Sequence, residues 1–188
     1  MSATVVDLLG AIESRASALK LTEPGPTHAH LEQIMRAAVR APDHGRLRPW
    51  RFVVLEGAAR EKLGNEMARL SLGKFPQSTP EQMDGERRKA LRAPTIIVVA
   101  ARITQGKIPE VEQIGAVAAG VENMVLTAQA LGYGSMWKTG AAAYDAQTKT
   151  MLGLDAQDRI VAFLYLGTTA LAGTASPASL DGAVTWMK

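Results

Sequence analysis

The sequence predicts an α+β protein in which helices surround a sheet. Three segments support this: continuous apolar, β-branched stretches at residues 95–101 and 160–166, and an amphipathic segment at 28–41. The first two have the length and composition of strands buried on both faces, and the third has apolar side chains at helical spacing. With 188 residues, 47% of them hydrophobic and 21% charged, the composition is that of a globular protein.

The other elements follow from periodicity and from the residues that begin and end them. Thr27, after the turn Glu-Pro-Gly-Pro, is suited to cap the amphipathic helix, and Pro42 ends it. Pro49 and Gly57 bound a strand. In chain order we predict helices at 4–14, 28–41, 58–72, 80–92, 110–131 and 144–152, and strands at 51–56, 95–101, 133–138 and 160–166.

Two of these helices differ in character. The segment 80–92 is rich in charge, so we expect it to be a solvated face or a mobile cover with weak order. The segment 110–131 is almost apolar all round and carries small residues, which predicts a buried helix. Its place, in the centre of the domain or in a subunit interface, stays open on the sequence alone.

The C-terminal end has a different composition. Gly167 is predicted to end the last strand, and residues 168–183 consist mainly of Ala, Ser, Thr, Gly and Pro. This composition predicts an extended tail with Trp186 as its apolar anchor. No internal linker divides the chain, so we expect one domain over residues 1–188.

Charge and residue types exclude several classes of function. The net charge is only +3, although the sequence pI is about 9.3, and cysteine is absent, which excludes disulfides and thiolate chemistry and favours a cytoplasmic protein. No metal site is predicted, because His28 and His30 are spaced i,i+2 on a helix. No segment is apolar enough to span a membrane. Gly132 and Gly134 do not complete a dinucleotide fingerprint, because Trp137 stands in place of the third glycine.

The densest chemical signal is a basic loop. Between Arg36 and Arg51 the chain has five arginines and one acid. Guanidinium groups bind phosphate and stack on planar rings, so the loop suits a phosphorylated aromatic ligand. The alternative is a solvated basic loop with Trp50 in the core. His44 either bonds a ligand oxygen or simply satisfies backbone groups.

Nucleic-acid binding through the same arginines is a further alternative. The small net charge and the aromatic content of 5% argue against it, and no motif places these arginines along a nucleic-acid backbone. We therefore expect no nucleic-acid partner.

A set of motifs, in order along the chain, resembles the minimal, YdjA-like branch of the nitroreductase family. The resemblance runs from about residue 5 to residue 168. Its motifs are Arg15 with Ser17, Glu23-Pro-Gly-Pro-Thr27, Arg40-Ala-Pro-Asp-His44, Arg48-Pro-Trp-Arg-Phe52, Arg92-Ala-Pro94, Gly134-Ser-Met-Trp-Lys-Thr-Gly140 and Phe163-Leu-Tyr-Leu-Gly167.

The resemblance implies a nitroreductase-like fold with a mostly antiparallel sheet surrounded by helices. It also implies an intertwined homodimer with FMN at the subunit interface. Residues 110–131 would then lie in the dimer core, and the tail, about 168–188, would pack on the partner subunit.

The resemblance also assigns site residues. The family's phosphate-side motif Arg-Arg-Ser corresponds to Arg15, Ala16 and Ser17, so one arginine is missing and we expect weaker FMN binding. Arg40 and His44 correspond to further flavin contacts. The same holds for the stretch Trp137, Lys138 and Thr139, where the family has Trp-Arg-Ser. A segment associated with the nicotinamide nucleotide corresponds to Thr127, Ala128, Gln129, Ala130, Leu131 and Gly132.

The implied activity is a ping-pong transfer of hydride from NAD(P)H, through FMN, to a nitroaromatic, quinone or related acceptor. We assign no catalytic residue, because in such enzymes the flavin carries the chemistry and the protein orients and tunes it. Lys138, or an arginine near the pyrimidine edge, is a hypothesis for stabilising negative charge on the reduced flavin. An FMN-binding carrier or sensor of the same fold, without nitroreductase activity, is the alternative.

Overall fold

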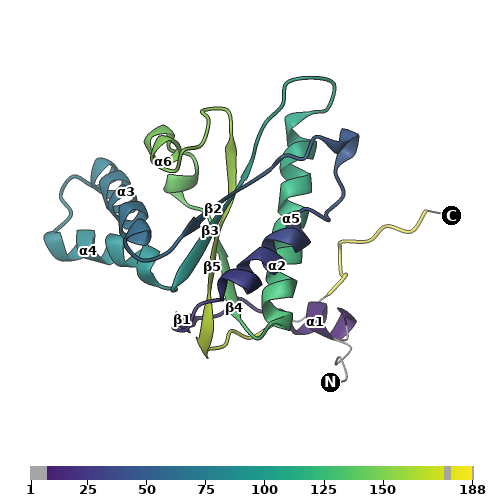
Figure 1. Ribbon diagram of the computed structural model, residues 1–188, viewed down its shortest axis with the longest axis horizontal. Helices are drawn as coiled ribbons and strands as arrows, with labels where there is room; N and C mark the ends of the chain where they lie inside the picture. Colours follow the sequence, from purple (N-terminus) through teal and green to yellow (C-terminus); the bar gives the residue numbers. More distant parts are fainter. Residues whose placement is uncertain (1–7, 176–178, 188) are drawn as a thin grey trace.

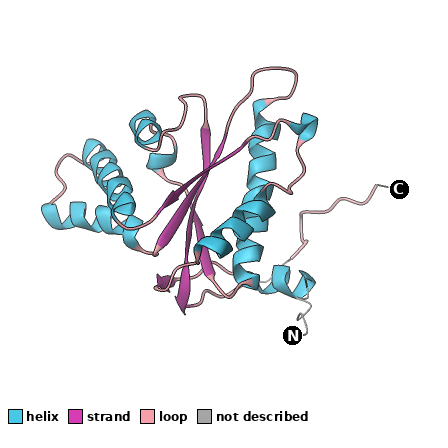
Figure 2. Ribbon diagram, in the orientation of Figure 1, coloured by secondary structure: helices cyan, strands magenta, loops and turns pink. Residues whose placement is uncertain are grey.

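The computed structural model describes residues 8–175 and 179–187. Helices flank a sheet on both sides (Figures 1 and 2). The elements are α1 (Leu8–Ser14), β1 (Lys20–Thr22), α2 (His28–Ala38), η1 (His44–Arg46), β2 (Trp50–Leu55), α3 (Ala58–Lys74), α4 (Pro80–Arg88), η2 (Lys89–Leu91), β3 (Thr95–Ala101), α5 (Glu110–Ala130), β4 (Gly134–Lys138), η3 (Ala141–Ala143), α6 (Ala146–Met151) and β5 (Arg159–Leu171), where η marks a 3-10 helix. The predicted α+β class is therefore confirmed.

The sheet is antiparallel at every pairing among the described strands. Its order is β1-β5-β3-β2, and β4 pairs with β5 beside this path. β3 is central, as predicted, and all of its residues are buried. It lies between β5 and β2 and is covered on both faces, which explains why its sequence is continuously apolar instead of alternating.

The two faces of the sheet belong to two separate cores. Ile97 and Val99 of β3 point into the core that α2 and α5 cover. Ile96 and Val98 point into the other core, on the side of α3 and α4. Figure 1 shows these two helix layers on opposite sides of the sheet. The sheet thus separates the side chains that pack on the α5 side from those that pack on the α3 side.

The prediction that Gly167 ends the last strand is wrong. β5 continues to Leu171, because its final residues pair with β1, a short strand that the sequence pattern did not reveal. A glycine is needed at position 167 because two other segments of the chain come close to it. A Cβ there would lie 2.7 Å from Pro94 Cδ and 2.9 Å from Thr22 O. The glycine therefore marks a close backbone approach inside the strand.

The polar segment 80–92 is helical as predicted, while its expected weak order stays a prediction. It forms α4 and η2, and Thr79 and Gln82 make a reciprocal capping box at the start of α4. Met83 of α4 is buried, and α4 packs against α3. One apolar anchor and a complete cap thus hold a helix whose other faces are charged.

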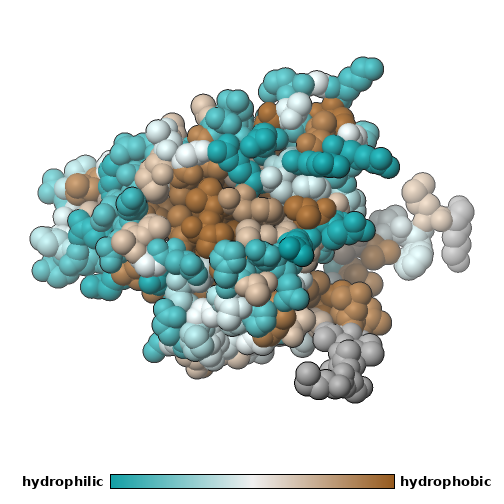
Figure 3. Space-filling model, in the orientation of Figure 1, coloured by the Kyte–Doolittle hydropathy of each residue, from teal (hydrophilic) through white to brown (hydrophobic). Residues whose placement is uncertain are grey.

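Some apolar surface stays uncovered. α5 is buried on one side only, while Val111 is 72% exposed and Gly115 and Ala119 are also exposed. α1 has no buried residue, and its side chains form part of the apolar area at the lower right of Figure 3. The predicted burial of the 110–131 helix is therefore only partly met within one chain. The predicted first helix begins at Leu8, and residues 4–7 lie outside the described part.

No helix among the described residues is both long enough and apolar enough to cross a membrane.

Candidate functional site

The phosphate-side residues Arg15, Ala16 and Ser17 lie in the segment between α1 and β1. Ala18 N donates a hydrogen bond to Ser135 O at 2.9 Å, which ties this segment to the start of β4. Arg15 Nε is 3.9 Å from Glu122 Oε1 of α5, and 38% of the Arg15 side chain is exposed. Since this contact is long and open to solvent, the guanidinium remains available to an anion.

Ala16 lines a small cavity of about 160 Å³, whose wall also includes Gln129 and Thr169. Gln129 donates to Ser14 Oγ at 3.1 Å. The structure thus brings one residue of the predicted nicotinamide segment next to the predicted phosphate segment. An alanine at position 16 leaves room there and supplies no charge.

The rest of the segment Thr127–Gly132 has structural tasks at the end of α5. Thr127 Oγ1 donates to Asn123 O at 2.7 Å, and Ala128 is fully buried. Leu131 is the C-cap, and Gly132 has a φ of 85°, a conformation that favours glycine. These contacts explain the segment without a ligand, and its predicted role in nucleotide binding stays a prediction.

Trp137, Lys138 and Thr139 lie at the end of β4, which forms one edge of the sheet. Trp137 Nε1 donates to Val161 O at 3.0 Å, which fixes the indole while leaving it 38% exposed. Lys138 follows at the next position and points to the opposite face, as successive residues of a strand do. This edge therefore presents a fixed aromatic ring on one face and a cation on the other.

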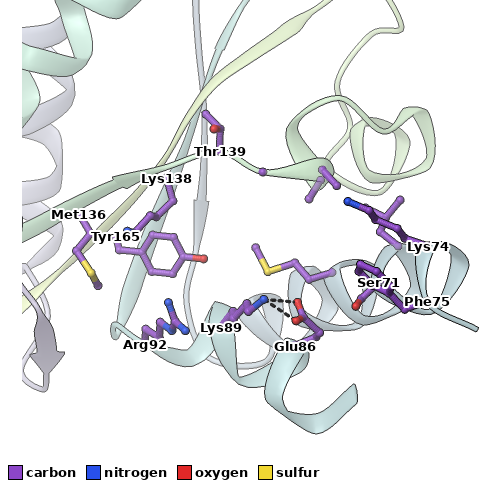
Figure 4. Close-up of a pocket in the computed structure, with 15 residues that line it drawn as sticks. Ser71, Lys74, Phe75, Glu86, Lys89, Arg92, Met136, Lys138, Thr139 and Tyr165 are labelled. Carbon is purple, nitrogen blue, oxygen red and sulfur yellow. Dashed lines mark hydrogen bonds and ion pairs between the residues drawn. The ribbon is translucent and has the colours of Figure 1, made fainter. Parts of the chain in front are cut away.

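A cavity of about 470 Å³ opens where Lys138 points (Figure 4). It lies between β4 and β5 on one side and α3 and α4 on the other. Met67, Leu70, Met136 and Ala142 are among its apolar lining. Its charged lining consists of Lys74, Glu86, Lys89, Arg92 and Lys138.

The cavity is strongly cationic, because its only acid is already paired. Lys89 Nζ lies 2.5 Å from both carboxylate oxygens of Glu86. The side chains of Lys74, Arg92 and Lys138 make no hydrogen bond or ion pair with another described residue, although Lys74 Nζ lies 5.3 Å from the centroid of the Phe75 ring. Such a cavity suits a planar, largely apolar ring with an electron-rich or anionic edge.

Tyr165 stands in the wall of the cavity, with its hydroxyl pointing inward (Figure 4). Burial raises the pKa of Tyr165 from 10.0 to about 12, and the charge of Arg92 acts against this shift. The hydroxyl therefore stays protonated at neutral pH and can donate a hydrogen bond to a ligand.

Arg40 and His44 lie elsewhere, on the α2 and α5 side of the sheet. Arg40 is exposed just beyond α2, and His44 begins η1 with its Nδ1 2.5 Å from Glu112 Oε2 of α5. No hydrogen bond or ion pair among the described residues joins either of them to Trp137–Thr139. Within one chain, His44 and Lys138 thus lie on opposite faces of the sheet.

The basic loop also divides into two kinds of arginine. Arg36 pairs with Glu32 at 3.1 Å, and Arg51 contacts Asp155 and the fully buried Asp158 at 3.2 and 3.1 Å. Arg51 is therefore structural, whereas Arg36, with 79% of its side chain exposed, lies on the surface like Arg40, Arg46 and Arg48. Trp50 packs in the α2 and α5 core, as the alternative interpretation of this loop expected.

Sequence reasoning did not name Lys89, Arg92 or Tyr165 as site residues. Arg92 and Tyr165 occur in motifs that carry the family resemblance, so a signal was present. Their convergence could not be seen, because they come from η2, from the residue after it and from β5. Within residues 8–175 and 179–187 there is also no group of three or more His, Cys, Asp or Glu side chains that could hold a metal ion.

Comparison with known proteins shows the family. Residues 12–168 match the nitroreductase family. YdjA of Escherichia coli K12, which carries the name of an NAD(P)H nitroreductase, is 37% identical over 174 residues, covering 91% of this chain and 93% of that protein.

Solved structures of other proteins share the fold. A nitroreductase-like family protein from Bacillus cereus has a TM-score of 0.84 at 23% identity, with 100% of both chains covered. A Desulfovibrio desulfuricans structure, described as a nitroreductase in complex with FMN, has a TM-score of 0.75 at 24% identity and covers 98% of this chain and 99% of that one. With matches over most of its length, this chain belongs to the nitroreductase family.

Proposed function

We propose that the protein is an FMN-dependent oxidoreductase that passes hydride from NAD(P)H, through the flavin, to a nitroaromatic, quinone or related acceptor by a ping-pong mechanism. The observation that carries this proposal is the cationic cavity beside Lys138 and Thr139, in a chain of the nitroreductase family. The name of the Escherichia coli relative and the FMN in the Desulfovibrio structure support it.

The residues present fit FMN. The half-buried Arg15 and the exposed Ser17 offer a guanidinium and a hydroxyl to a phosphate, at the Gly134 end of β4. Lys138, at the other end of the same strand, points into a cavity large enough for part of a flavin ring system. A strand of five residues spans about 13 Å between its first and last residue, which matches an extended cofactor with a phosphate at one end.

When bound, FMN supplies the acceptance and donation of hydride. The residues of the chain supply orientation, charge and exclusion of water. The hydrogen bond from Trp137 to Val161 O fixes the indole at the edge. Lys138 and Arg92 hold positive charge in the cavity, and the neutral Tyr165 hydroxyl can donate to an acceptor atom. Met67, Leu70 and Met136 keep the wall apolar, which strengthens these electrostatic interactions.

We further propose that the site is completed by a second copy of the chain. Lys138 points to the α3 side of the sheet, whereas His44 contacts α5 on the other side. A second subunit that contributes His44 would let one FMN contact both residues. The uncovered side of α5, with Val111, is then available for the partner. The tail, which extends away from the body in Figure 1 with Trp186 86% exposed, would pack on the other subunit.

The test is purification followed by turnover. We expect a yellow protein with the absorbance of flavin and the mass of a dimer by light scattering, and oxidation of NADH or NADPH that depends on a nitroaromatic or quinone acceptor. A colourless monomer that does not bind added FMN would overturn the proposal. A flavin-bound dimer without turnover would instead favour a carrier or sensor.

A further inference from the structure

Glu112 of α5 contacts the basic loop at His44. Its Oε2 lies 2.5 Å from Nδ1 of His44, 68 residues away in sequence. Both side chains remain partly open to solvent, with 67% of His44 and 44% of Glu112 exposed. A carboxylate only accepts hydrogen bonds, so Nδ1 of His44 must carry the proton in this contact.

The Glu112 side of the contact is rigid. The next residue, Gln113, is 2% exposed, and its amide bonds three backbone groups of the preceding loop. Its Oε1 accepts from Thr104 N at 2.9 Å, and its Nε2 donates to Thr104 O at 2.9 Å and Ile108 O at 3.0 Å. These bonds hold the first turn of α5 and thereby fix the position from which Glu112 extends.

Around His44, several contacts hold the backbone, whereas a single contact holds the imidazole ring. Asp43 Oδ2 accepts from Arg48 N at 2.7 Å, and the side chain of Ile108 occupies the space beside Gly45. Arg46 and Arg48 have φ values of 54° and 52°, a conformation that costs energy for residues other than glycine. Glu112 is the only described hydrogen-bond partner of the His44 ring. The orientation of the imidazole thus depends on this one bond.

We propose that Glu112 is a positioning residue for His44. It holds Nδ1, so that Nε2 is the nitrogen presented to the ligand. This inference rests on the proposed function, in which His44 contacts FMN. Without Glu112 the ring would rotate about its side-chain bonds and exchange tautomers, and part of the binding free energy would be lost in ordering it again.

The first experiment examines His44 without any cofactor. The chain has three histidines, so long-range ¹H–¹⁵N spectra of their imidazole rings can be assigned with single variants. We expect the His44 ring to carry its proton on Nδ1 and to change to a mixture of tautomers in Glu112→Ala. The matched control is Glu110→Ala in the same helical turn, whose Oε1 pairs with Arg159 Nε at 2.7 Å, and there the His44 signals should stay unchanged.

The second experiment is a double-mutant cycle on FMN affinity, measured by fluorescence quenching on flavin-free protein. We expect Glu112→Ala to raise the Kd of FMN by about tenfold, Glu112→Gln to raise it less because the amide oxygen still accepts, and Glu110→Ala to leave it unchanged. In a His44→Ala background, Glu112→Ala should have no further effect.

Two results overturn the inference while FMN still binds the wild type: unchanged His44 spectra in Glu112→Ala, or an equal loss of affinity with and without His44. A wild-type protein that binds no FMN overturns the proposed function instead. The spectra of His44 then still report whether Glu112 orients the ring.

Discussion

The basic loop around His44 and the cavity beside Lys138 hold their side chains by different means. On the surface of α5, the orientation of the His44 side chain in the loop depends on one hydrogen bond, to Glu112. The backbone of the loop includes two arginines at positive φ. The cavity is built on β4 and β5, whose ladder fixes Lys138 and Tyr165, while its cations Lys74 and Arg92 stay unpaired. We infer that the loop orients bound FMN, whereas the cavity supplies positive charge to it. The following predictions test this division.

The largest effect is expected at Arg51, where the basic loop enters β2. Replacement of Arg51 by Met leaves the fully buried Asp158 without its cation, so the free energy of unfolding should fall by about 3 kcal/mol. Arg46→Met, in the exposed part of the loop, should change it by less than about 0.5 kcal/mol. Urea denaturation of both variants measures this. An equal loss of unfolding free energy in the two variants would show that Arg51 is no more important for stability than Arg46.

The next effect concerns charge in the cavity. Lys138→Met removes an unpaired cation from the lining, and we expect the midpoint potential of bound FMN to fall by about 30 mV, since positive charge favours the reduced flavin. Dye-equilibrated redox titration measures the potential. Lys62→Met, on an exposed part of α3 outside the cavity lining, is the control. An unchanged potential in the Lys138 variant would contradict the assigned role.

The phosphate side is expected to respond to charge gained. Ala16 lines a cavity with room for a longer side chain, so Ala16→Arg should lower the Kd of FMN by about fivefold by adding a phosphate contact. Ala16→Met adds similar bulk without charge and should not tighten binding. Isothermal titration with FMN distinguishes the two. A gain in the methionine variant would assign the effect to packing.

The smallest effect is a pH dependence of stability at Tyr165. Its pKa is raised from 10.0 to about 12 by burial, so the folded state retains a proton that the unfolded state releases between these values. The stability contribution of this proton is complete below pH 10 and is lost as the pH rises toward 12. Between pH 9 and pH 11 the free energy of unfolding of the wild type should fall by about 1 kcal/mol more than that of Tyr165→Phe. If the unfolding free energies of the two proteins, measured in urea, change with pH in parallel, the raised pKa of Tyr165 is contradicted.

Much of the fold could be predicted from local pattern. β3 has the predicted bounds, and α5 ends one residue before the predicted position, because both segments have an unmistakable periodicity or composition. β1 could not be predicted, since three residues carry no period and its pairing partner lies at the other end of the chain. The interpretation of Gly167 failed for the same reason, because only the crossing with Pro94 and Thr22 explains that glycine.

The sequence by itself determined which residue types this protein has for its chemistry: a basic loop with one histidine, a Trp-Lys-Thr stretch, no cysteine, and motifs that resemble one family. Only the tertiary structure decided how they group. It placed Lys138 with Arg92 and Tyr165 on one face of the sheet and His44 with Glu112 on the other. The physical reason is that adjacent strand residues point to opposite faces, while contacts across a sheet or onto a helix join residues far apart in the chain.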